Sequence, residues 1–291
     1  MNILGVDIGG SFIKFVYKDK DFIQKGKIPT NQSFDYILKE IKNLKNNFSP
    51  EKLGIAIAGV YDKKYGRISA SPNLKFLEGI DLKEILTSEL KINLEIFNDA
   101  SAAAYGEYKY GAGKNAQILI CLTLGTGLGG GAVIEGNLLD GISGSSMEIG
   151  HTTIELEGWH CHCGRKGCLE AYVSSYGLER FYFFLTDVKK TSKEIIFLAN
   201  EGKLEAIKAI DEFSRYLALG LMNILHIFNP DKIVIGGGIP EYYPAVIDLA
   251  ISKLKNLAFK LPLRDVVITK AQLGEFSGAY GALALMENEY R

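Results

Sequence analysis

The chain has 291 residues, enough for one large domain or for two lobes with substantial cores. Its 33 Lys and Arg residues nearly balance its 34 Asp and Glu residues, and the net charge of −1 argues against a nucleic-acid or acidic-membrane partner. Asp7 stands where a signal peptide is apolar, and the longest apolar stretch, residues 216–228, is too short to span a bilayer. We therefore expect a cytoplasmic protein.

Apolar periodicity predicts alternating strands and helices in the first 110 residues. Asp81 and Glu84 resemble a capping box at the start of the second helix. The expected elements are strands at 3–8, 12–18, 22–27, 53–58 and 94–97, and helices at 33–47, 81–90 and from 99 to about 110.

The polar, glycine-bearing segment at 111–115 predicts a boundary between two lobes. The expected elements after it are strands at 117–124, 131–135, 232–235 and 266–269, and helices near 174–185, 191–200, 203–228, 241–257 and from 275. Residues 4–17 and 121–134 both have the pattern apolar strand, glycine turn, apolar strand, and each opens one half of the chain. The pattern favours two duplicated α/β lobes, each begun by a β-hairpin.

The first glycine turn follows a strand that ends near Asp7. Gly9 and Gly10 let the backbone approach a ligand closely, Ser11 adds a hydroxyl, and Lys14 is close enough in sequence to reach the same phosphates. Asp7 is positioned to hold magnesium through water. The alternative is a tight hairpin that binds nothing.

Residues 125–130, GTGLGG, match the spacing G-x-G-x-x-G, but a dinucleotide-binding fold requires a helix after that motif. A strand is expected here instead, so the dinucleotide interpretation fails. A third glycine run, Gly236–Gly238, also follows a strand. Together the three runs indicate a nucleotide held between two lobes, as in actin-like ATP-binding proteins.

Asp99 follows Asn98 at the junction of an expected strand and an alanine-rich helix. It is either the N-cap of that helix or a catalytic carboxylate presented by a rigid element. Further along, Cys161, Cys163 and Cys168 supply three thiols within eight residues, and this clustering favours a structural zinc site over a plain loop with reduced cysteines. The candidates for the fourth ligand are His151, His160 and His162, of which His162 should point away.

These motifs together resemble the ROK family of sugar kinases and sugar-responsive repressors. The resemblance covers nearly the whole chain, and its most specific parts are EIGH at 148–151 and the cysteine run C-x-C-G-x-x-G-C-x-E at 161–170. The other matches are DIGGS with Lys14, Ser71-Pro72-Asn73-Leu74, Asn98-Asp99, LGTGLGGG at 124–131 and GGGI at 236–239. Met147 departs from the Gly or Ala that the family often has before EIGH, and Ser11 replaces the more common Thr.

The resemblance implies a two-lobed actin-like (ribonuclease H-like) ATPase fold, each lobe being a mixed sheet flanked by helices. Residues 1–112 would form a smaller lobe, completed by the C-terminal helix at about 276–291. Residues 113–275 would form a larger lobe with a zinc-binding loop.

The resemblance also implies a role for each matched residue. Asp99 would be the general base, and Asp7 would hold Mg²⁺ through water. The ATP site would comprise Gly9, Gly10, Ser11, Lys14, Gly125, Thr126, Gly127, Gly237 and Gly238. The sugar site would comprise Gly59, Asn73, Asn98, Asp99, Glu148, His151 and Glu170. Structural Zn²⁺ would be held by His151, Cys161, Cys163 and Cys168.

The implied activity is transfer of the γ-phosphate of ATP to a hexose, with glucose as the leading substrate. N-acetylmannosamine, N-acetylglucosamine, fructose and allose are alternatives within the family. A sugar-sensing transcriptional regulator is the non-enzyme alternative, but family repressors carry a helix-turn-helix domain before the kinase-like part, which here begins at Ile3. Family members are often dimers or tetramers, so a homodimer or homotetramer is expected.

Overall fold

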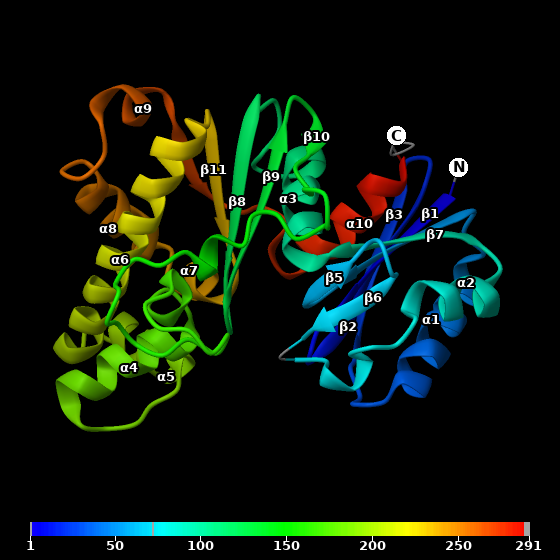
Figure 1. Ribbon diagram of the computed structural model, residues 1–291, viewed down its shortest axis with the longest axis horizontal. Coiled ribbons are helices and arrows are strands. Elements are labelled where there is room, and N and C mark those ends of the chain that lie inside the picture. Colours follow the sequence, from blue (N-terminus) through cyan, green and yellow to red (C-terminus); the bar gives the residue numbers. More distant parts are fainter. Residues whose placement is uncertain (1, 72, 288–291) are drawn as a thin grey trace.

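The computed structural model describes residues 2–71 and 73–287. Two five-stranded sheets stand apart, and two helices, α3 (Asp99–Tyr110) and α10 (Ser277–Glu287), pack against each other between them (Figure 1). This architecture confirms the predicted fold class, a pair of mixed sheets flanked by helices. Pro72 of the SPNL motif and residues 288–291 of the expected C-terminal helix lie outside the described residues.

The first sheet has the strand order β3-β2-β1-β4-β7. Its hairpin strands pair antiparallel, and β4 and β7 extend it in parallel. The helices α1 (Phe34–Phe48) and α2 (Leu82–Leu90) share a hydrophobic core with it. The strands span Asn2–Ile8 (β1), Phe12–Asp19 (β2), Phe22–Pro29 (β3), Lys52–Ile57 (β4) and Asn93–Asn98 (β7).

The second sheet repeats this arrangement with the order β10-β9-β8-β11-β12, in which β8 and β9 form the opening hairpin. Most of the remaining helices lie on its outer side, away from the first sheet (Figure 1). The strands span Ile118–Leu124 (β8), Leu128–Ile134 (β9), Asn137–Leu138 (β10), Lys232–Gly236 (β11) and Val267–Lys270 (β12). The helices are Ser175–Thr186 (α4), Ser192–Asn200 (α5), Leu204–Phe228 (α6), Gly238–Tyr242 (α7), Ala245–Leu254 (α8) and Lys260–Asp265 (α9).

Two segments of the chain connect the sheets, one after α3 and one before α10, and one buried carboxylate accepts hydrogen bonds from both. Glu107, near the end of α3, is completely buried, and its Oε2 accepts a hydrogen bond from the Ala112 backbone N–H at 2.8 Å. Its Oε1 accepts from the backbone N–H groups of Gln272 and Leu273 at 3.1 and 2.8 Å. Because α3 packs on β8 and β9 as well as on α10, a hydrophobic cluster continues from one sheet to the other. The division of the chain into lobes at residue 112 stays a prediction.

Several local expectations were wrong. The second glycine turn is shorter than expected, because β9 already begins at Leu128. A Cβ atom at Gly129 would lie 2.8 Å from the Ala100 side chain, and one at Gly131 would lie 2.7 Å from the Ala100 carbonyl oxygen. These glycines therefore belong to a strand that packs directly on the start of α3, rather than to a turn.

Two helix ends also differ from expectation. Among the described residues, Asp81 makes no capping hydrogen bond to α2, because its carboxylate accepts from the Arg67 guanidinium. The helix expected at 241–257 is two helices, α7 and α8, separated at Tyr243 and Pro244. The short hairpin of β5 (Val60–Asp62) and β6 (Arg67–Ala70) was not expected from the sequence.

Within residues 2–71 and 73–287, no helix combines the length and apolarity needed to cross a membrane.

Candidate active site and metal centre

The first glycine turn lies between β1 and β2 and is closed by a hydrogen bond from the Gly9 N–H to the Phe12 carbonyl at 3.0 Å. Asp7 and Lys14 are paired across these strands, and the Lys14 Nζ lies 3.4 Å from the Asp7 Oδ2. Burial raises the pKa of Asp7, while the positive charge of Lys14 opposes that rise. The turn therefore carries a buried carboxylate with one cation beside it.

The second and third glycine runs lie next to each other at the ends of neighbouring strands, β8 and β11. Gly237 has a φ of 100°, and a Cβ atom there would lie 2.2 Å from the Leu124 carbonyl oxygen. Glycine is required at this position for both reasons. The backbone at the end of β8 and the backbone after β11, which are far apart in the sequence, are thus in close contact.

A cavity of about 410 Å³ lies where the first and second glycine turns face each other. Gly10 and Ser11 line it from one hairpin, Thr126 lines it from the other, and Asn73 contributes from the SPNL segment. The cavity is lined in addition by Gln32 and Lys75, which sequence reasoning missed. Lys75 directly follows the SPNL motif, and this adjacency was the one signal that pointed to it; nothing local in the sequence singled out Gln32.

The junction of β7 and α3 assigns the helix cap to Asn98 rather than to Asp99. The Asn98 Oδ1 accepts from the Ser101 N–H at 2.9 Å, and its amide donates to the Gly59 carbonyl at 3.0 Å. Asp99 accepts from the Ala100 N–H at 2.9 Å and is half-buried. Burial raises the pKa of Asp99 to about 7, the charges of Asp7 and Glu148 add to the rise, and the backbone hydrogen bonds oppose it.

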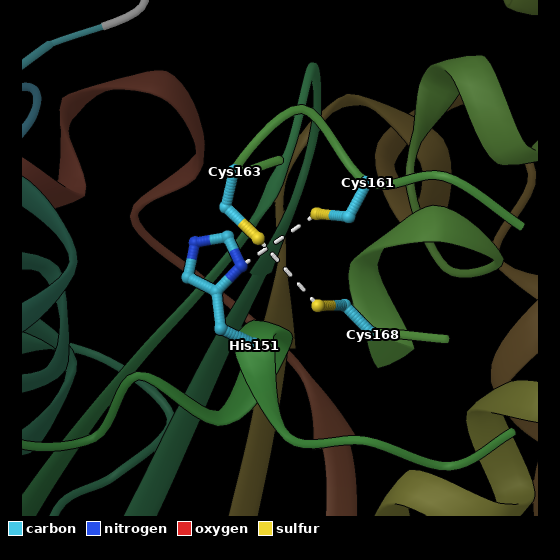
Figure 2. Close-up of side chains that lie close together, drawn as sticks. All are labelled: His151, Cys161, Cys163 and Cys168. Carbon is cyan, nitrogen blue, oxygen red and sulfur yellow. Dashed lines mark hydrogen bonds between the residues drawn. The ribbon is translucent and has the colours of Figure 1, made fainter. Parts of the chain in front are cut away.

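Four side chains predicted as metal ligands point toward a common centre in Figure 2. Their ligand atoms all lie within 4.8 Å of one another. The Cys161 Sγ is 3.7 Å from the His151 Nδ1, and the Cys163 Sγ is 3.6 Å from the Cys168 Sγ. In a tetrahedral site with zinc–sulfur bonds of about 2.3 Å, neighbouring sulfurs are about 3.8 Å apart. The donor set and its spacing therefore fit zinc.

The same segment carries two carboxylates that face the metal group. The His151 Nε2 lies 4.0 Å from the Glu148 Oε2, so its two ring nitrogens face a carboxylate and the cysteines respectively. Glu170 Oε2 accepts from the Leu128 N–H at 3.0 Å, next to the second glycine turn.

His160 and His162 lie outside the four-residue group. Met147 has a φ of 64°, and its side chain is buried in the core of the second sheet.

The comparisons with known proteins decide the family. The family model described as "ROK family" matches residues 3–289. The chain belongs to the ROK family.

ROK relatives of two kinds match the chain. A xylose repressor from Bacillus spizizenii is 34% identical over 80% of this chain, and the match spans 60% of the repressor, less than two thirds of its length. A glucokinase from Streptomyces coelicolor is 30% identical over 97% of this chain and 96% of the relative. The solved structure of a ROK family glucokinase from Streptomyces griseus, in complex with glucose and AMPPNP, has a TM-score of 0.85. The solved chain is 29% identical to this chain, and the match covers 98% of this chain and 99% of the solved one.

Proposed function

We propose that this ROK protein is an ATP-dependent sugar kinase that phosphorylates a hexose, with glucose as the first candidate. The observation that carries the proposal is the position of Asp99. Its carboxylate is half-buried at the start of α3, and Asn98 rather than Asp99 caps the helix. The full-length similarity to a glucokinase supports the same assignment.

In the proposed reaction, a sugar hydroxyl attacks the γ-phosphorus of ATP, and the bond from that phosphorus to the β,γ-bridging oxygen breaks. Asp99 accepts the proton of the hydroxyl, and the products are the sugar phosphate and ADP. A base with a pKa near 7 is ionised in enough molecules at neutral pH and still accepts a proton readily.

The glycine turns are proposed to bind the nucleotide. Ser11 and Thr126 line the cavity from opposite hairpins, and their hydroxyls and the backbone N–H groups of the turns are proposed to donate to phosphate oxygens. Lys75 lines the cavity and Lys14 pairs with Asp7 near the end of β1, and both are proposed to supply positive charge to the phosphates. Gly237 and Gly238 are proposed to lie against the adenosine. Asp7 would hold magnesium through water, and the ion would supply positive charge to the phosphates.

The sugar is proposed to contact Gly59, Asn73, Asn98, Glu148, His151 and Glu170 through its hydroxyls. Several polar groups on one sugar face give discrimination, because an analogue that lacks a hydroxyl leaves its partner unpaired. Three thiolates and one imidazole would hold zinc in a closed site, where it would supply structural constraint on the loop. His151 belongs to both sets, so the metal loop would shape the sugar site.

A sugar-responsive regulator is the second candidate, and the 34% identity to a xylose repressor favours it. Both candidates bind a sugar, but only a kinase needs a proton acceptor and a phosphate site. Asp99, Asp7 and Lys14 are all present, and a net charge of −1 gives the chain no overall positive charge for DNA. These features support the kinase.

One experiment separates the candidates. The purified chain would be assayed for ADP release from ATP with glucose, fructose, allose, xylose, N-acetylglucosamine and N-acetylmannosamine. With polyphosphate as an alternative donor, formation of the sugar phosphate would be measured instead. Sugar binding would be measured in parallel by calorimetry. Turnover of any hexose supports the kinase, whereas binding of a sugar without turnover of any supports the regulator. Light scattering of the same sample tests the proposed homodimer or homotetramer.

A further inference from the structure

Tyr176, in the first turn of α4, directs its hydroxyl toward both the metal group and the sugar site. The hydroxyl oxygen lies 3.2 Å from the Glu170 Oε1 and 3.6 Å from the Cys161 Sγ. Those two atoms are themselves 3.5 Å apart. The Tyr176 hydroxyl therefore lies beside both Cys161, a proposed metal ligand, and Glu170, a proposed sugar ligand.

Charge repulsion in the metal-bound form would explain the position of the Tyr176 hydroxyl. Zinc binds the thiolate form of cysteine, so the Cys161 sulfur then has no proton to donate to Glu170. A thiolate and an ionised carboxylate at this separation repel each other. The Tyr176 hydroxyl is neutral and donates to either anion, and it therefore offsets this repulsion.

The ring of Tyr176 is held independently of its hydroxyl. The His162 ring stacks on it with centroids 4.0 Å apart, and the Arg180 guanidinium lies 5.1 Å from its centroid on α4. Phenylalanine would keep both contacts. The other oxygen of Glu170 is already bound to the Leu128 N–H, so the tyrosine contact fixes the second oxygen of the same carboxylate.

We propose that Tyr176 is a positioning residue, whose hydroxyl holds the Glu170 carboxylate beside the Cys161 thiolate and so couples the metal loop to the sugar site. The sugar part of this inference rests on the proposed function, and the metal part does not. Hydrogen bonds from outside the ligand set typically change metal affinity 10–100-fold when they are removed.

The test is the variant Tyr176→Phe, with Tyr65→Phe on the exposed β5–β6 hairpin as a matched control. Zinc affinity would be measured by competition with a chromogenic chelator, and glucose affinity by calorimetry without ATP. We expect Tyr176→Phe to lower zinc affinity about tenfold and to weaken glucose binding, while the KM for ATP stays within about twofold. Tyr65→Phe should match the wild type in all three.

The variants Glu170→Gln and Tyr176→Phe/Glu170→Gln complete a double-mutant cycle. If charge repulsion is the cause, the loss of zinc affinity caused by Tyr176→Phe should be much smaller when residue 170 is neutral. An unchanged zinc affinity in Tyr176→Phe, or an equal loss with either residue at position 170, would overturn the proposal. Because the zinc competition needs no turnover, its result stands even if no sugar is phosphorylated and the proposed function fails.

Discussion

The side-chain amide of Asn98 donates to the Gly59 carbonyl oxygen across 3.0 Å and joins the start of α3 to the loop after β4. Because the same side chain caps the helix through Ser101, Asn98 fixes both the direction of α3 and the position of that loop. Asp99 is the next residue, so its carboxylate is presented by a backbone that is held from two sides.

The first prediction follows from this arrangement. Asp99→Asn keeps the shape of the side chain but removes the proton acceptor, so kcat should fall by roughly two to four orders of magnitude. Sugar affinity should change much less, because an amide still accepts a hydrogen bond. Steady-state kinetics at saturating ATP, with the exposed Asp35→Asn as a control, would measure this. A near-normal kcat in Asp99→Asn would remove Asp99 as the base.

The pH dependence of the reaction should report the same carboxylate. Burial and the charge of Asp7 raise the pKa of Asp99 to about 7. The base must be ionised to act, so kcat/KM for the sugar should be full above this pH and should fall about tenfold per pH unit below it. The ascending limb would be absent from the residual activity of Asp99→Asn. A wild-type profile that stays flat from pH 8 down to pH 5 would contradict this assignment.

Lys14 is the cation nearest the buried Asp7, at 3.4 Å, and its substitution should affect the nucleotide more than the sugar. Lys14→Ala removes one positive charge from the phosphate region and also allows the pKa of Asp7 to rise further, which weakens its hold on magnesium. We expect a higher KM for ATP and a lower kcat, with glucose affinity within about twofold by calorimetry. Lys39→Ala, on the exposed face of α1, is the control. If Lys14→Ala leaves both the KM for ATP and kcat unchanged, Lys14 does not belong to the nucleotide site.

Local patterns predicted most of the fold, and two of the misses share one physical cause. Ser33 begins α1 by accepting from the Tyr36 N–H, as a local capping signal should. Asp81 carries the same kind of signal, yet its carboxylate binds Arg67, fourteen residues away. The glycines of β9 have the composition of a turn, but in the structure they belong to a strand that packs against α3. In both cases a contact between distant segments overrides the local preference.

The same reasoning explains what was found and missed in the site. The three cysteines of the proposed zinc site were predictable because thiols at such short spacing have a distinctive chemistry. The choice of His151 over His160 and His162 came from the resemblance to the ROK family. Gln32 and Lys75 share the cavity only because two hairpins and the SPNL segment meet there. Glu107 appeared to be an ordinary residue of an alanine-rich helix, whereas its partners, Gln272 and Leu273, lie more than 160 residues away. No periodicity or motif identifies Gln32 or Glu107.

The last prediction links the metal to substrate selection. Cys163→Ala leaves three of the four proposed ligands, so the chain should lose one bound zinc. The loop from His151 to Glu170 would then lose its main constraint, because residues 155–166 are mostly exposed and few of them are anchored in a core. The KM for the sugar should rise far more than the KM for ATP, since the second glycine turn joins two paired strands, β8 and β9, and Gly237 packs against Leu124. Both sheets should stay folded on their own cores. Metal analysis and steady-state kinetics would test this against Cys121→Ala, which removes a buried thiol of β8 outside the metal group. A wild-type protein without zinc, or a zinc-free Cys163→Ala with a normal KM for the sugar, would refute the metal assignment and favour a plain loop with reduced cysteines.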